Sequence, residues 1–174
     1  MISGTIGEPV LYHLLDDMKK DGYRDKERLR LFIDSHGGKI ASALTMARFL
    51  MSAFNDIETY AIGSVDSAAV TLYLCGQRRI AYETSRFFLH PAGIEVNGVQ
   101  TAQQLRTILK GLQAESEAMI SFYAERTALP ASYWRRVLSN EQYLSAETAR
   151  EKQIVTDITT TPTTFPQDGL ILTA

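Results

Sequence analysis

Apolar residues recur at helical spacing in several stretches of the chain. Between residues 11 and 20, Leu11, Leu14, Leu15 and Met18 fall on one face of a helix. The same spacing predicts a second amphipathic helix over residues 40–54 and a very long one over about 101–127. Shorter helices are predicted over residues 67–74, 131–138 and 145–152.

Short apolar runs lie between these helices and predict strands at residues 29–33, 58–62, 80–82, 87–89 and 154–155. Two regions, residues 31–38 and 60–69, share one design: an apolar run stops at a turn rich in Gly and Ser and is followed by a helix. This is a weak structural repeat. Strands that alternate with helices in this way indicate an α/β domain.

The predicted helix at about 101–127 is on the order of 40 Å long, more than a domain of this size can cover. We expect it to project and to pack on another subunit, because its apolar face would otherwise stay exposed. An exposed extended segment between Gly93 and Gly98 precedes it. From residue 159 the chain is rich in Thr and Pro, which predicts a loose tail over 159–174.

The chain has 174 residues, which suits one domain, and its net charge of −2 argues against nucleic-acid or membrane binding through bulk charge. Its one cysteine, Cys75, lies in an apolar run and is interpreted as core packing rather than as a reactive thiol. The sequence has neither an apolar run long enough for a membrane span nor the pattern of a signal peptide, so a cytoplasmic location is expected.

The candidate chemistry centres on Ser67, at the start of a predicted helix, and His90, at the end of a predicted strand. The pair can act as nucleophile and base. The N–H of Ala68 and the turn at Gly37 and Gly38, where the backbone can approach a substrate closely, are candidate donors to an oxyanion. Taken singly, Ser67 also suits a plain helix cap, the glycines a tight turn, and His90 a core imidazole.

Four segments, in order, resemble the proteolytic subunit of the Clp protease (ClpP), whose fold is shared with the crotonase superfamily. Residues 32–38 (FIDSHGG) are similar to the family's strand and "SPGG" turn, and residues 63–69 (GSVDSAA) to its "GxAxSMGA" turn. Residues 85–91 (SRFFLHP) are similar to "SRxMIHQP", and residues 142–157 (QYLSAETAREKQIVTD) to "RFLSAxEAxxxGLVD".

The resemblance implies an α/β fold built as a spiral of repeated β-β-α units over residues 1–158, with a protruding "handle" at about 93–127. It also implies a serine endopeptidase that cleaves peptides or unfolded proteins through an acyl-enzyme, inside a homo-oligomeric ring or double ring. No cofactor, metal or nucleic acid is implied. The implied residues are Ser67 and His90 for catalysis with Glu141 as the acid, Gly38 and Ala68 for the oxyanion hole, and Gly37, Gly93, Ile94, Glu95 and Val96 for the substrate.

The sequence departs from the family's pattern at several positions. Glu141 stands where the family has an aspartate, and a solvated surface charge is the other interpretation of it. His36 replaces a proline, and Asp66 replaces a small residue beside the serine. The resemblance also starts at Met1, where the family's first core strand lies, without the preceding segment that gates the pore and engages the unfoldase. Docking to an ATPase unfoldase is therefore in doubt.

Three alternatives remain open. The first is a catalytically silent subunit that assembles with an active relative, favoured by the changed acid and by the missing N-terminal segment. The second is a crotonase-type acyl-CoA enzyme, although no adenine pocket is evident and a serine–histidine pair is not what that chemistry needs. The third is a Ser–Lys dyad of the kind found in signal-peptide peptidases, but no lysine lies close to Ser67 in the sequence and there is no membrane anchor.

Overall fold

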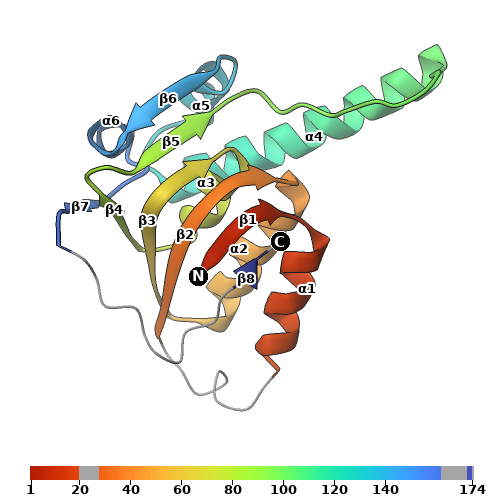
Figure 1. Cartoon of the computed structure of the whole chain (residues 1–174). Helices are drawn as coiled ribbons and strands as arrows, with labels where there is room; N and C mark the ends of the chain where they lie inside the picture. Colours follow the sequence, from red (N-terminus) through yellow and green to blue (C-terminus); the bar gives the residue numbers. More distant parts are fainter. Residues whose placement is uncertain (20–27, 162–171, 174) are drawn as a thin grey trace.

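A computed structural model of the chain describes residues 1–19, 28–161 and 172–173. A twisted sheet forms its centre, and Figure 1 shows helices packed against it and one long helix leaving the body. The strands are β1 (Ile2–Ile6), β2 (Arg28–Gly38), β3 (Asp56–Asp66), β4 (Arg78–Tyr82), β5 (Arg86–Leu89), β6 (Gln142–Ser145), β7 (Asp157–Thr159) and β8 (Leu172–Thr173). The helices are α1 (Glu8–Asp17), α2 (Ile40–Ala53), α3 (Ala68–Tyr73), α4 (Ala102–Arg126), α5 (Ala131–Val137) and α6 (Ala146–Glu151).

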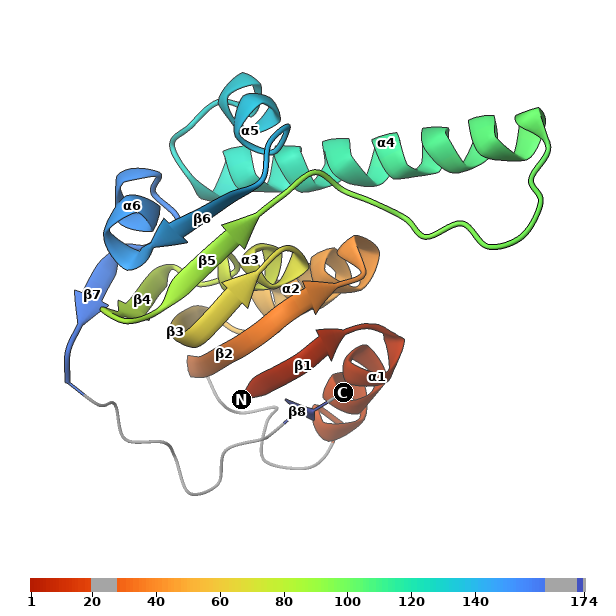
Figure 2. The ribbon, with the colours of Figure 1, turned by 45° about the horizontal axis from the view of Figure 1, so that its top comes forward.

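The strand order is β6-β5-β3-β2-β1-β8, and β4 joins β3 to β7 outside this path. Strand β3 is shared between two neighbours. Its first half pairs with β4, where Glu58 lies opposite Arg78, and its last residues pair with β5, where Asp66 lies opposite Phe88. Among the described strands every pair is parallel except β5 with β6. The carboxyl ends of β1, β2, β3 and β5 therefore point the same way (Figure 2).

The main core fills the space between the sheet and helices α2 and α3. Every residue of α3 is buried, and α2 buries six, among them Ala43, Met46 and Leu50. A smaller apolar cluster, in which the rings of Phe32 and Tyr60 stack 4.7 Å apart, is separate from this core. Helix α3 follows β3 without a loop, so the core fixes the point where strand becomes helix. This junction carries Ser67.

A second feature of the core is the aromatic packing between the inner end of α4 and α5. The indole of Trp134 is fully buried, donates from Nε1 to Thr127 Oγ1 at 2.9 Å, and meets the rings of Tyr123 and Tyr133 edge-on at 5.2 and 5.3 Å. These contacts hold α5 against the base of the long helix.

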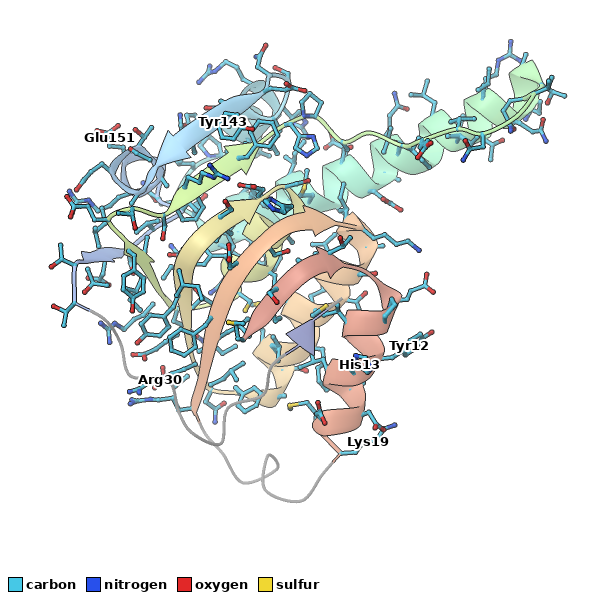
Figure 3. The ribbon with its side chains drawn as sticks, in the orientation of Figure 1. Tyr12, His13, Lys19, Arg30, Tyr143 and Glu151 are labelled. Atoms are coloured by element: carbon cyan, nitrogen blue, oxygen red, sulfur yellow. The ribbon has the colours of Figure 1, made fainter. Side chains whose placement is uncertain are left out.

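Replacing Trp134 by alanine is expected to lower the free energy of unfolding by about 3–5 kcal/mol, because it leaves a large cavity and removes the hydrogen bond that Thr127 Oγ1 accepts. Urea denaturation followed by circular dichroism measures the loss. The matched control is Tyr12→Ala on α1, whose side chain points into solvent (Figure 3) and which is 63% exposed. A loss of comparable size in both variants would contradict this account of the core.

Helix α4 projects from the domain, as its length predicts. Its buried residues are confined to Met119–Tyr123 near the inner end, whereas Leu105 and Leu109 on the outer half are 49% and 53% exposed. The chain from residue 91 to 101 runs alongside the outer half in both ribbon views (Figures 1 and 2). A capping box between Thr101 and Gln104 starts the helix at the far tip.

Several sequence predictions need correction. The strand expected at residues 154–155 is wrong: Ile154 and Val155 are buried in the turn after α6, and β7 begins at Asp157, where the backbone pairs with β4. Strands β2 and β3 run through the residues interpreted as turns, to Gly38 and Asp66. Strand β6 was not predicted as a strand.

Two predicted boundaries lie at the edge of the described residues. Helix α1 spans Glu8–Asp17, whereas the expected helix ended at residue 20, outside the described residues. Most of the expected tail, residues 162–171 and 174, also lies outside them. Leu172 and Thr173 are described and pair with Ile2 and Ser3 of β1. None of the helices in the described ranges combines the length and apolar character needed to cross a bilayer.

Candidate active site

Ser67 lies at the junction of β3 and α3 in an unusual backbone conformation. Its φ is +54° and its ψ is −124°. A non-glycine residue in the positive-φ region costs energy and persists only where the surroundings enforce it. Its N–H donates to Phe88 O at 2.7 Å, and its side chain makes no capping hydrogen bond with the helix. The interpretation of Ser67 as a plain helix cap is therefore wrong.

The glycine turn lies directly against this serine. Gly37 has φ +91°, and a Cβ there would lie 2.8 Å from Ser67 Cβ and 2.9 Å from Ala68 N. Gly38 has φ +146°, and a Cβ there would collide with the carbonyl of Ile6. Both positions thus require glycine, because the backbone is too close for any side chain. The structure packs Gly37 against Ser67 and Ala68 at the start of α3, and it packs Gly38 against Ile6 of β1.

Ala68 supplies the other predicted donor. It is the first residue of α3, so its N–H has no acceptor within the helix. The residue is fully buried and follows Ser67 directly. An amide in this position is oriented by the start of the helix rather than by a flexible loop.

His90 follows the last residue of β5 and shares a small pocket with Ser67. Its Nδ1 lies 2.7 Å from the carbonyl oxygen of Pro91. Because a carbonyl only accepts, Nδ1 carries the hydrogen, and in the neutral ring Nε2 keeps a free lone pair. The imidazole also stacks on the ring of Phe88, with centroids 5.2 Å apart. Among the described residues no hydrogen bond joins His90 to Ser67.

Glu141 immediately precedes β6, the strand that pairs with β5. The antiparallel register pairs Leu89 with Gln142, so its continuation by one step sets Glu141 opposite His90. The side chain of Glu141 is exposed, and within the described part of the chain no hydrogen bond joins it to His90. The strand register therefore sets the candidate acid next to the histidine along the backbone, without a hydrogen bond between the two side chains in the described part of the chain.

The predicted substrate segment, Gly93 to Val96, is exposed and belongs to no strand ladder among the described residues. Ile94 is 59% exposed, and nothing lies within 4 Å of a Cβ built on Gly93. It leads away from His90 along α4 (Figure 2). An extended backbone without partners is available to pair with a second extended chain.

The pocket beside Ser67 has apolar walls that the sequence did not indicate. Besides the two candidate catalytic residues, it is lined by Ile40, Leu89, Ala92, Met119, Tyr123 and Leu138. Burial raises the pKa of the Tyr123 phenol well above its usual value, so this group stays protonated and is no base. These residues come from four separate parts of the chain, and no sequence motif connects them.

Comparisons with known proteins agree with this geometry. The Clp protease family matches residues 13–162 of the chain. A curated relative, the ATP-dependent Clp protease proteolytic subunit 1 of Thermobifida fusca (strain YX), is 24% identical over 159 residues, which cover 90% of this chain and 70% of the relative. Among solved structures, a mutant of ClpP1 from Listeria monocytogenes matches with a TM-score of 0.75 at 21% identity, over 91% of this chain and 88% of that chain.

The fold and the serine junction define an α/β protein of the ClpP-like class, which confirms the predicted fold class. The family match covers most of the chain, and the chain therefore belongs to the Clp protease family. It is a peptidase of the ClpP type. The resemblance drawn from the sequence motifs is confirmed.

Proposed function

We propose that the chain is a serine endopeptidase that hydrolyses peptides or unfolded proteins through an acyl-enzyme. One observation carries the proposal: Ser67 is held at positive φ against the glycine turn, in a pocket that it shares with His90. A strained residue with an unused hydroxyl contributes nothing evident to stability. Strain of this kind is typical of catalytic positions.

The proposed reaction begins when Nε2 of His90 takes the proton of Ser67 Oγ as this oxygen attacks the scissile carbonyl. The N–H groups of Gly38 and Ala68 donate to the resulting oxyanion. The Nε2–H then protonates the leaving amine, the C–N bond breaks, and an ester on Ser67 remains. A water molecule, deprotonated by the same nitrogen, attacks the ester and frees the carboxylate and Ser67.

The tautomer of His90 supports this assignment. An acid residue in a catalytic triad accepts a hydrogen bond from Nδ1 and so leaves Nε2 as the base. Here the carbonyl of Pro91 accepts that bond at 2.7 Å. We propose that Glu141, which the strand register sets opposite His90, takes over this role in the active arrangement and adds its charge to stabilise the imidazolium.

The substrate would lie in extended form along Gly93 to Val96 on one side and Gly37 on the other, and pair with the enzyme as an added strand.

We propose further that the chain works as a ring assembly, with α4 packing on another copy. The outer half of α4 exposes Leu105 and Leu109, and Val99 beside it is 99% exposed. Apolar groups gathered on one projection are typical of a contact surface. The relatives include a protein named as a proteolytic subunit, a name that describes one part of a larger assembly.

A silent subunit is the second candidate, and one observation favours it. The side chain of Glu141 makes no hydrogen bond with His90, and none links His90 with Ser67 among the described residues. A subunit without a connected triad could serve assembly alone.

A fluorophosphonate probe distinguishes the two candidates, because it reacts with an activated serine. We expect the purified chain to be labelled at Ser67, identified by mass mapping of the modified peptide, and a peptide aldehyde to slow the labelling. Native mass measurement on the same sample reports the assembly. An unlabelled, well-folded oligomer would overturn the peptidase proposal and support the silent subunit.

A further inference from the structure

A hydrogen bond joins two side chains directly behind the candidate site. His36 Nδ1 lies 3.1 Å from Asp66 Oδ2. The two residues immediately precede the elements of the site: His36 stands before Gly37, and Asp66 stands before Ser67. We call this pair the His36–Asp66 bridge.

The bridge lies where the regular pairing between β2 and β3 ends. The last pair in the register of the two strands is Ser35 with Val65, so His36 and Asp66 are the next residues on both strands. After these two residues β2 and β3 no longer pair with each other, and Gly37 packs against Ser67. The bridge therefore ties the glycine turn to the serine junction across the gap between the two strands.

The burial of Asp66 is not explained by stability. The residue is 7% exposed, and its Oδ1 is buried without a hydrogen-bond partner among the described residues. A buried carboxylate oxygen left unpaired destabilises a fold. A small apolar residue would fit this position without that penalty, so the carboxylate points to a functional reason.

Other charged groups near the bridge are already engaged. Arg86 Nε on β5 donates to Ser64 Oγ at 2.7 Å, and Asp34 Oδ1 on β2 accepts from Ser64 N at 2.8 Å. Asp66 Oδ2 is left with the imidazole of His36, whose side chain is 81% exposed. The bridge therefore requires a carboxylate oxygen on Asp66 as acceptor and an N–H donor on residue 36.

We infer that the His36–Asp66 bridge is a positioning device for the proposed peptidase reaction, which holds the glycine turn at the correct distance from Ser67. The inference rests on the proposed function. Neither side chain touches the substrate in this role. The bridge acts through the backbone, because Gly37 packs against the Asp66 carbonyl and Ser67 Cβ.

The test measures kcat and KM for a peptide substrate and the second-order rate of fluorophosphonate labelling at Ser67, in the full-length protein. His36→Ala is expected to lower kcat and the labelling rate about tenfold with little change in KM, since a shift of the donors by a fraction of an ångström affects the transition state most. His36→Asn, whose amide N–H falls near the position of Nδ1, is expected to restore both rates to within about twofold.

The matched control is His13→Ala, because His13 is exposed on α1 (Figure 3), away from the site, and its loss is expected to change neither rate. Labelling of His36→Ala at the wild-type rate would overturn the inference and leave the proposed function intact. The inference would also be overturned if His36→Asn were labelled as slowly as His36→Ala, or if the labelling of His36→Ala fell only in proportion to the amount of folded protein. An unlabelled wild type refutes the proposed function, and the inference with it.

Discussion

Replacing Ser67 by alanine is expected to lower kcat for peptide hydrolysis by on the order of 10⁴-fold or more and to abolish fluorophosphonate labelling. The expectation follows from the acyl-enzyme route, in which Oγ supplies the bond-forming electron pair. The folded state should survive, because the hydroxyl makes no capping hydrogen bond and its loss leaves the packing of α3 unchanged. Stopped assays with a fluorogenic peptide, together with thermal unfolding, measure the two effects.

The control for this variant is Ser52→Ala. Ser52 is an exposed serine on α2 that donates only to the carbonyl of Phe49. Its removal is expected to leave kcat and labelling unchanged. If hydrolysis by Ser67→Ala continued at the wild-type rate, the measured activity would come from another group, and the serine mechanism would be wrong.

Replacing Gly37 by alanine is expected to lower the labelling rate at Ser67 at least about a hundredfold. The new methyl group would lie 2.5 Å from the Asp66 carbonyl oxygen, 2.8 Å from Ser67 Cβ and 2.9 Å from Ala68 N, and the residue would have to keep a φ of +91°. None of these neighbours is the end of a flexible side chain. Either the glycine turn or the serine junction must move, and both carry the proposed site.

Gly111→Ala on α4 is the matched control, since a Cβ there meets nothing within 4 Å. It is expected to leave labelling unchanged and to raise stability by up to about 1 kcal/mol, because alanine favours the helix over glycine. The labelling rate is to be taken per folded chain, with folding followed by circular dichroism. Normal labelling of folded Gly37→Ala would contradict the close packing that defines the site.

Much of the fold could be predicted from local patterns. Helices α2, α4 and α5 were located to within a residue or two at each end, because each combines an apolar face with a clear stop. The strand ends were harder. In β2 and β3, residues such as Gly37 and Ser64 are typical of turns, yet a neighbouring strand pairs with each: Thr5 of β1 lies opposite Gly37, and Arg86 of β5 lies opposite Ser64. Tertiary pairing overrides local preference in such cases.

At β7 the prediction failed in the opposite way, because residues predicted as a strand do not form one. Ile154 and Val155 have the composition of a strand but serve as buried packing residues in a turn. The residues that do pair, from Asp157 on, have no apolar alternation, since they form a short strand beside β4. An apolar pair indicates burial and does not indicate backbone conformation.

For the site, the sequence indicated the chemical groups but not their arrangement. Ser67, His90 and the glycine turn were identified from residue types and motifs. The hydrogen-bond acceptor for His90 Nδ1 could not be identified from the sequence, because it is a backbone carbonyl and every residue has a carbonyl. The His36–Asp66 bridge carried a usable signal: each residue stands immediately before an element of the site, on parallel strands.

The attachment of Ser67 to β5 has one more consequence. The amide of Ser67 donates to the carbonyl of Phe88, and His90 is only two residues further along the same stretch of chain. Because of this hydrogen bond, a sliding or tilting of the strand would tend to move Ser67 and His90 together. A rotation of the imidazole about its own χ angles, in contrast, would change the distance between His90 Nε2 and Ser67 Oγ without any movement of the strand.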